Sequence, residues 1–203
     1  MDTTQPLHNQ EIHSFLLWMP NWIGDVVLTL PVIQSLRRAY PVARISVVAR
    51  TPADELLLGH PAIDTVLILP SGSENGYWQK IKFARDLKKF NFDVGVVFPN
   101  SFGSAFLLSL TGVKCRLGYA TDGRDILLTH PVTTTSNLKK TQYRVEYFFK
   151  IFSSLKLDVP DREFARLISQ EGDATTREIF LDMGMDKDEE FLILHPGTSK
   201  VER

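Results

Sequence analysis

An aspartate lies where a short apolar run gives way to a helical pattern. The run covers residues 15–19, and Gly24 and Asp25 come just before apolar residues that recur with a period close to 3.6. A carboxylate at such a strand-to-helix turn can take a proton from a bound hydroxyl. It can also be a helix N-cap or a first-turn acid that the helix dipole favours. The two roles are compatible, because a helix terminus also holds the side chain in place.

Two further groups of small polar residues follow predicted strands. Asn21 either orients a substrate hydroxyl or stabilises a turn, and Gly24 either permits a tight turn with close substrate approach or is an ordinary loop glycine. Asn100, Ser101 and Gly103 precede a predicted helix, whose free N–H groups can bind a hydroxyl or a phosphate. The alternative for Ser101 is a simple N-cap in an ordinary loop.

A glycine-containing turn follows the last predicted strand, residues 191–195. Backbone N–H groups, hydroxyls and a cation in such a turn can together hold a diphosphate. The spacing is not that of a Walker A motif. The candidate ligands are His195, Gly197, Thr198, Ser199, Lys200 and Arg203.

Metal and thiol chemistry find little support. Asp186 and Asp188 have the D-x-D spacing with which some transferases hold a divalent metal, but a solvated acidic turn is the preferred interpretation. Cys115 is the single cysteine, which excludes an intrachain disulfide and a paired-cysteine zinc site and favours a buried structural thiol. His60 and His130 each precede a proline and are interpreted as turn residues, so no metal ligand set is expected.

The elements that must position these residues alternate between strand and helix. Strands are predicted at residues 15–19, 44–49, 65–69, 93–98, 114–117 and 191–195, and helices at residues 25–40, 52–58, 78–89, 101–110, 140–155 and 175–183. Pro31 either kinks the first helix or marks a new helical start. The alternation predicts an α/β fold with a doubly wound parallel sheet.

In such a sheet, ligands bind beyond the carboxyl ends of the strands. The loops at residues 20–25, 99–103 and 118–125 are therefore the expected sites. The 203 residues are 43% hydrophobic and 23% charged with a net charge of -1, which is ordinary for a globular protein and excludes a strongly basic nucleic-acid-binding protein. The polar N-terminus does not resemble a signal peptide, and no apolar run is long enough for a transmembrane helix.

Four segments together resemble the lipopolysaccharide heptosyltransferases of glycosyltransferase family 9, and look most like the members that add the second heptose. They match in order and spacing over nearly the whole chain. The segments are residues 21–27, 99–105, 117–124 and 195–198. The resemblance implies a GT-B architecture, in which two Rossmann-like domains face a cleft.

The implied reaction is inverting transfer of L-glycero-D-manno-heptose from ADP-heptose to the lipid A-core oligosaccharide, without metal or cofactor. Asp25 is the implied catalytic base. The implied acceptor-binding residues are Asn21, Gly24, Asn100, Ser101 and Arg124. The implied donor-binding residues are those of the C-terminal turn, with Arg203 nearest to the family's basic residue for the leaving phosphates.

Arginine suits an anionic core because it binds carboxylate or phosphate through two hydrogen bonds. A solvated loop residue is the alternative for Arg124. Arg116, Arg144 and the pair Lys139 and Lys140 either extend a basic acceptor surface or, as we prefer, lie on solvated faces.

We expect a polar leader at residues 1–13, an acceptor domain at 14–166, and the start of a truncated donor domain at 167–203. One alternative is a related family member with another sugar donor or acceptor. The other is a non-catalytic acceptor-binding module, if the chain ends at Arg203. A cytoplasmic location is expected, and peripheral contact with the inner face of the cytoplasmic membrane stays open.

Overall fold

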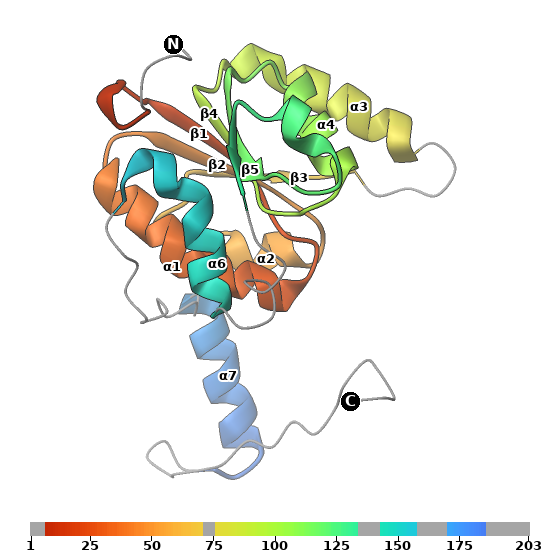
Figure 1. The fold of residues 1–203 in the computed structure, drawn as a ribbon. Coiled ribbons are helices and arrows are strands. Elements are labelled where there is room, and N and C mark those ends of the chain that lie inside the picture. Colours follow the sequence, from red (N-terminus) through yellow and green to blue (C-terminus); the bar gives the residue numbers. More distant parts are fainter. Residues whose placement is uncertain (1–6, 71–75, 134–142, 158–169, 186–203) are drawn as a thin grey trace. The chain divides into compact units, whose positions relative to one another are not determined.

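A computed structural model describes residues 7–70, 76–133, 143–157 and 170–185 (Figure 1). The chain divides into two compact units, Met1–Ala165 and Arg166–Arg203. In the second unit the structure describes one helix, α7 (Gln170–Asp182), close to the predicted helix at 175–183. The features below belong to the first unit.

Six parallel strands form one sheet in the order β3-β2-β1-β4-β5-β6. The strands are β1 (Ser14–Trp18), β2 (Arg44–Ala49), β3 (Thr65–Ile68), β4 (Val94–Val97), β5 (Cys115–Tyr119) and β6 (His130–Val132). This order confirms the predicted doubly wound parallel sheet. The first five strands lie within two residues of their predicted bounds. The sixth predicted strand, at 191–195, lies outside the described residues.

Strand β6 corrects the interpretation of His130 as a turn residue. The segment is only three residues long and contains Pro131, which argues against a strand in a sequence pattern. β6 is, however, the last strand of the sheet, where proline is tolerated because one side needs no hydrogen-bonded neighbour.

Helices cover both faces of the sheet, with α1 and α6 on one face and α3 and α4 on the other (Figure 1). Their bounds are α1 (Ile23–Ala39), α2 (Ala53–Leu57), α3 (Gly76–Asp86), α4 (Phe102–Leu110) and α6 (Arg144–Phe149). Short 3-10 helices are η1 (Leu7–Asn9), η2 (Leu87–Phe90), η3 (Arg124–Leu127) and η4 (Lys150–Leu155). Within the described part of the helix predicted at 140–155, residues 144–149 are α-helical and residues 150–155 form η4.

The central strand β1 is buried on both faces. Leu16 and Trp18 belong to the apolar cluster beneath α3 and α4. Phe15 points to the opposite side, where its ring meets the edge of Tyr40 at the end of α1, with the ring centroids 5.1 Å apart. A strand packed on both sides is a rigid support for the loop that follows it.

Pro31 lies inside one continuous helix, so the alternative of a new helical start is wrong. Proline lacks the N–H that would bond to the carbonyl four residues earlier. The Oγ of Ser35 donates a hydrogen bond of 3.1 Å to the Pro31 carbonyl. Burial of Val26, Leu30 and Ile33 along one face holds this helix against the sheet.

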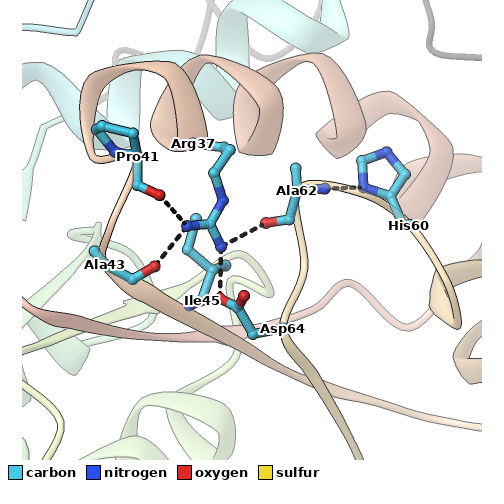
Figure 2. A network of polar contacts seen from close by, with 7 residues as sticks. All are labelled: Arg37, Pro41, Ala43, Ile45, His60, Ala62 and Asp64. Atoms are coloured by element: carbon cyan, nitrogen blue, oxygen red, sulfur yellow. Dashed lines mark hydrogen bonds and ion pairs between the residues drawn. The ribbon is translucent and has the colours of Figure 1, made fainter.

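Arg37 ties the end of α1 to the start of β2 and the approach to β3 (Figure 2). Its guanidinium donates to the carbonyls of Ala43 at 2.6 Å and Ala62 at 3.3 Å, and pairs with the Asp64 carboxylate at 2.5 Å. Asp64 also accepts from the backbone N–H of Ile45 at 2.6 Å. One side chain therefore joins three segments on this half of the sheet.

We predict that Arg37→Met lowers the free energy of unfolding by about 2 kcal/mol, because it removes hydrogen bonds that involve a charged group. Urea denaturation measures the change. The matched control is Arg85→Met at an exposed position of α3, which should change stability by less than about 0.5 kcal/mol. Equal stability of the two variants would contradict a tertiary role for Arg37.

Candidate functional site

The chain changes direction across the sheet between β1 and β4. It leaves β1 toward β2 and β3, then returns to build β4, β5 and β6 on the other side. Trp18 pairs with Val97 at the carboxyl ends of the two strands, so the loops that follow start side by side. In doubly wound sheets this switch point is where ligands bind.

A pocket of about 160 Å³ opens at this edge. Its volume is below the range of about 300–1,000 Å³ that encloses a drug-sized ligand, so it suits one sugar ring or one polar group. Asn21 and Ser101 line it together, as their places after β1 and β4 predict. The other lining residues are Trp18, Arg50, Leu69, Tyr77, Lys80, Pro99, Gly103, Ser104 and Leu107.

Two cations of this pocket were not among the predicted site residues. Arg50 directly follows β2, and Lys80 comes from α3. The position of Arg50 at the carboxyl end of a strand was a usable signal. Lys80 had none, because on a single helix it resembles any other solvated lysine. Together they make the pocket attractive to an anionic group.

Asp25 is the third residue of α1. The N-cap residue Trp22 provides no side-chain cap, and the Asp25 side chain is about a quarter exposed. The positive end of the helix dipole favours a carboxylate here. Asp25 is not among the pocket-lining residues, but it shares the loop and first helical turn after β1 with Asn21. Its partner is Arg144, with Nε 3.2 Å from Oδ1 and Nη2 3.5 Å from Oδ2.

Ser101 is the N-cap of α4, as predicted. Its Oγ accepts from the backbone N–H of Ser104 at 3.4 Å and donates to the Ser104 hydroxyl at 3.1 Å. Asn100 is anchored by the structure itself. Its Nδ2 donates to the Tyr147 hydroxyl at 2.7 Å, and its Oδ1 accepts from Arg124 at 3.4 Å.

Arg124 does not occupy the exposed position expected of an acceptor ligand. It is fully buried, and its guanidinium donates to the carbonyls of Tyr119 and Pro99 as well as to the Asn100 side chain. Burial lowers the pKa of Arg124 to about 10. The burial contradicts the solvated-loop alternative for Arg124. Its assignment to acceptor binding stays a prediction, and the structure gives the guanidinium backbone carbonyls as partners instead. Arg124 thus holds the loop after β4 in place through its contacts with Pro99 and Asn100.

Gly24 does not form the tight turn that was one of its predicted roles. It lies within the first turn of α1 and has no left-handed backbone conformation, so no tight turn depends on it. A Cβ atom built on Gly24 meets nothing within 4 Å. The space above this backbone is open, which is compatible with close substrate approach.

Three comparisons place this geometry among known proteins. The family model of glycosyltransferase family 9 (heptosyltransferase) matches residues 80–203, more than half of the chain. This chain belongs to glycosyltransferase family 9. The match confirms the resemblance to this family that the four sequence segments show.

Relatives of this family-9 chain carry consistent names. It is 27% identical over 149 residues to lipooligosaccharide heptosyltransferase 2 of Haemophilus ducreyi, covering 73% of this chain and 42% of that protein. It is 30% identical over 112 residues to lipopolysaccharide heptosyltransferase 2 of Escherichia coli, covering 54% of this chain and 32% of that protein. The chain thus matches less than half the length of these curated relatives.

Solved structures share the fold. The glycosyl transferase family 9 protein from Veillonella parvula matches with a TM-score of 0.76 at 16% identity, covering 93% of this chain and 53% of that one. E. coli ADP-heptose lps heptosyltransferase II matches with a TM-score of 0.64 at 19% identity, covering 86% and 52%. The family-9 chain therefore has the α/β fold of these glycosyltransferases over about half of their length.

Other predicted residues fall into two groups. Arg116 donates to the carbonyls of Leu127 at 2.6 Å and Val113 at 2.7 Å, so it braces the β5 region. Cys115 is buried, as predicted, and burial raises the pKa of its thiol. The remaining predicted residues lie outside the described part of the chain. They are Lys139, Lys140, Asp186, Asp188, His195, Gly197, Thr198, Ser199, Lys200 and Arg203.

The described ranges contain neither a membrane-spanning helix nor a clustered metal site. No helix there is long and apolar enough to cross a membrane. No group of three or more His, Cys, Asp or Glu side chains there is placed to hold a metal ion.

We predict that Arg124→Gln lowers the free energy of unfolding by about 2–3 kcal/mol, because buried carbonyls at Pro99 and Tyr119 lose a charged donor. Chemical denaturation measures the loss, with the exposed Arg85→Gln as the matched arginine control. A stable Arg124→Gln protein with weaker acceptor binding would instead restore Arg124 as a direct ligand.

Proposed function

We propose that this chain is the acceptor-binding part of an inverting glycosyltransferase, and that Asp25 is its catalytic base. The donor is ADP-heptose, and the acceptor is the lipopolysaccharide inner core at the position of the second heptose. The observation that carries the proposal is the Asp25 carboxylate at the N-terminus of α1, beside the β1–β4 switch point.

The proposed reaction is a single displacement that needs one base to take the proton of the acceptor hydroxyl. An acceptor hydroxyl oxygen forms a bond to the anomeric carbon of the heptose while the bond from that carbon to the ADP phosphate oxygen breaks. The hydroxyl proton passes to Asp25, which later releases it to water. Attack from the face opposite to the leaving ADP inverts the anomeric configuration.

The pocket at the carboxyl ends of β1 and β4 supports an anionic sugar acceptor. Asn21 and Ser101 offer hydrogen-bonding groups, while Arg50 and Lys80 offer positive charge. A lipopolysaccharide inner core is a saccharide that carries carboxylates and phosphate. The relatives in Haemophilus ducreyi and E. coli are both named heptosyltransferase 2, which supports the choice of the second heptose over other sugars.

The donor half of the proposal rests on the second unit. We assign residues 14–166 to the acceptor domain and residues 167–203 to the beginning of a donor domain. The diphosphate would be held by the turn at residues 195–200, and Lys200 and Arg203 would neutralise the leaving group. A nucleotide-sugar donor and a lipid-linked acceptor meet at the inner face of the cytoplasmic membrane, which we propose as the place of action.

We predict that Asp25→Asn lowers kcat by about 10²–10⁴-fold, the range typical of a general base. The assay follows ADP release by the protein at its full natural length, with ADP-heptose present and with or without a core-lipid acceptor. ADP should appear only when both substrates are present. Thermal unfolding should be nearly unchanged, because an amide can keep one hydrogen bond to Arg144.

The matched control is Asp86→Asn at the exposed end of α3, which should keep the kcat of the unmodified protein. A turnover of Asp25→Asn equal to that of this control would remove Asp25 as the base.

Metal removal tests the leaving-group chemistry. The proposal assigns the phosphate charge to Lys200 and Arg203, so dialysis against EDTA should leave the rate of ADP release within about twofold of the untreated protein. A large loss that Mg²⁺ or Mn²⁺ restores would contradict this assignment. It would direct attention to Asp186 and Asp188 instead.

A further inference from the structure

The contact between Asp25 and Arg144 joins residues 119 positions apart in the sequence. Nε and Nη2 of Arg144 lie on one edge of the guanidinium, and each faces a different oxygen of Asp25, at 3.2 and 3.5 Å. A two-point contact of this kind restrains the plane of the carboxylate, which a single-point contact from a lysine does not. Each Asp25 oxygen keeps a lone pair that Arg144 does not use.

Arg144 is itself held in place by aromatic rings. It is the first residue of α6, and its guanidinium carbon lies 4.8 Å from the ring centre of Tyr147 and 5.0 Å from that of Phe148. Both rings are buried, and Phe148 meets the edge of Phe98 just after β4. Stacking on two fixed rings limits the directions that the arginine can take.

The same ring platform is linked to the loops of the site. Tyr147 stacks on Tyr119 with the ring centroids 4.3 Å apart, and the Tyr119 hydroxyl donates to the Tyr147 carbonyl at 2.5 Å. The Tyr147 hydroxyl accepts from Asn100 at 2.7 Å. α6 is thereby connected to the end of β5 and to the segment after β4, while it packs against α1.

Stability alone is a weak reason for this arrangement. The side chains of Arg144 and Asp25 are 40% and 26% exposed, and ion pairs this accessible to water typically contribute about 0–1 kcal/mol. The pair stands at the helix N-terminus beside the switch point, where the direction of a carboxylate matters for chemistry.

We propose that Arg144 is a positioning residue that orients the carboxylate of Asp25 toward the acceptor hydroxyl. The inference rests on the proposed role of Asp25 as base. Arg144 does not touch the acceptor. The rings of Tyr147 and Phe148 set the direction of the Arg144 guanidinium. The packing of α6 against α1 keeps that guanidinium next to Asp25.

The first test is Arg144→Gln in the protein at its full natural length, assayed by ADP release with ADP-heptose and a core-lipid acceptor. We expect kcat to fall about 10–100-fold, the loss typical of a displaced catalytic group, with KM for both substrates changed less than threefold. Arg144→Lys should melt at the temperature of the unmodified protein yet recover little of kcat, because lysine makes a single-point contact. An unchanged kcat, or a loss confined to KM for the acceptor, would overturn the proposal.

The second test is a double-mutant cycle with Asp25→Asn. If Arg144 acts through Asp25, adding Arg144→Gln to the Asp25→Asn protein leaves its residual rate within about twofold. A further loss equal to that in the unmodified background would show independent action and reject the inference. Full activity of Asp25→Asn alone would reject the base itself, so the two failures are distinguishable. Arg85→Gln is the matched arginine control and should leave both rates unchanged.

Discussion

The parallel pairing of β1 with β4 is the constraint from which the site follows. Two strands that are far apart in the sequence lie side by side at the centre of the sheet, and the chain departs from them in opposite directions. Their carboxyl ends consequently face the same edge without a connection crossing it. Asn21 and Ser101 come to line one pocket for this reason, and Asp25 lies in the first turn of α1, four residues after Asn21.

Two arginines support this edge in opposite ways. Arg124 is buried among neutral oxygens of the segments after β4 and β5, and desolvation is the main reason for its lowered pKa. A charge in that place holds several carbonyls in a fixed geometry. It adds a charged donor to the Tyr119 carbonyl, which also accepts from the Thr121 N–H, and to the Pro99 carbonyl, which also accepts from the Ser104 hydroxyl. Arg144 stays accessible to water and meets the Asp25 carboxylate. Arg124 shapes the loop after β4, and Arg144 faces the carboxylate that we propose as the catalytic base.

Local signals in the sequence were sufficient for much of the fold. The apolar run at residues 15–19 predicts a doubly buried strand, and Ser101 before a helical pattern predicts an N-cap, because both depend on neighbouring residues. Strand β6 was missed because three residues that include a proline carry no periodic signal. The α-helix predicted to run to residue 155 ends at Phe149, since the pattern continues while the backbone tightens into η4.

The sequence by itself determined the parallel α/β architecture, the family, and the position of Asp25 at a strand-to-helix turn, because periodicity and short motifs encode these features locally. Only the tertiary structure decided what the arginines do. Arg124 and Arg144 both stand in unremarkable sequence contexts, yet one is fully buried and the other faces Asp25 from 119 residues away. Burial and partner choice depend on which distant segments the sheet brings together, and no spacing within a single segment specifies that.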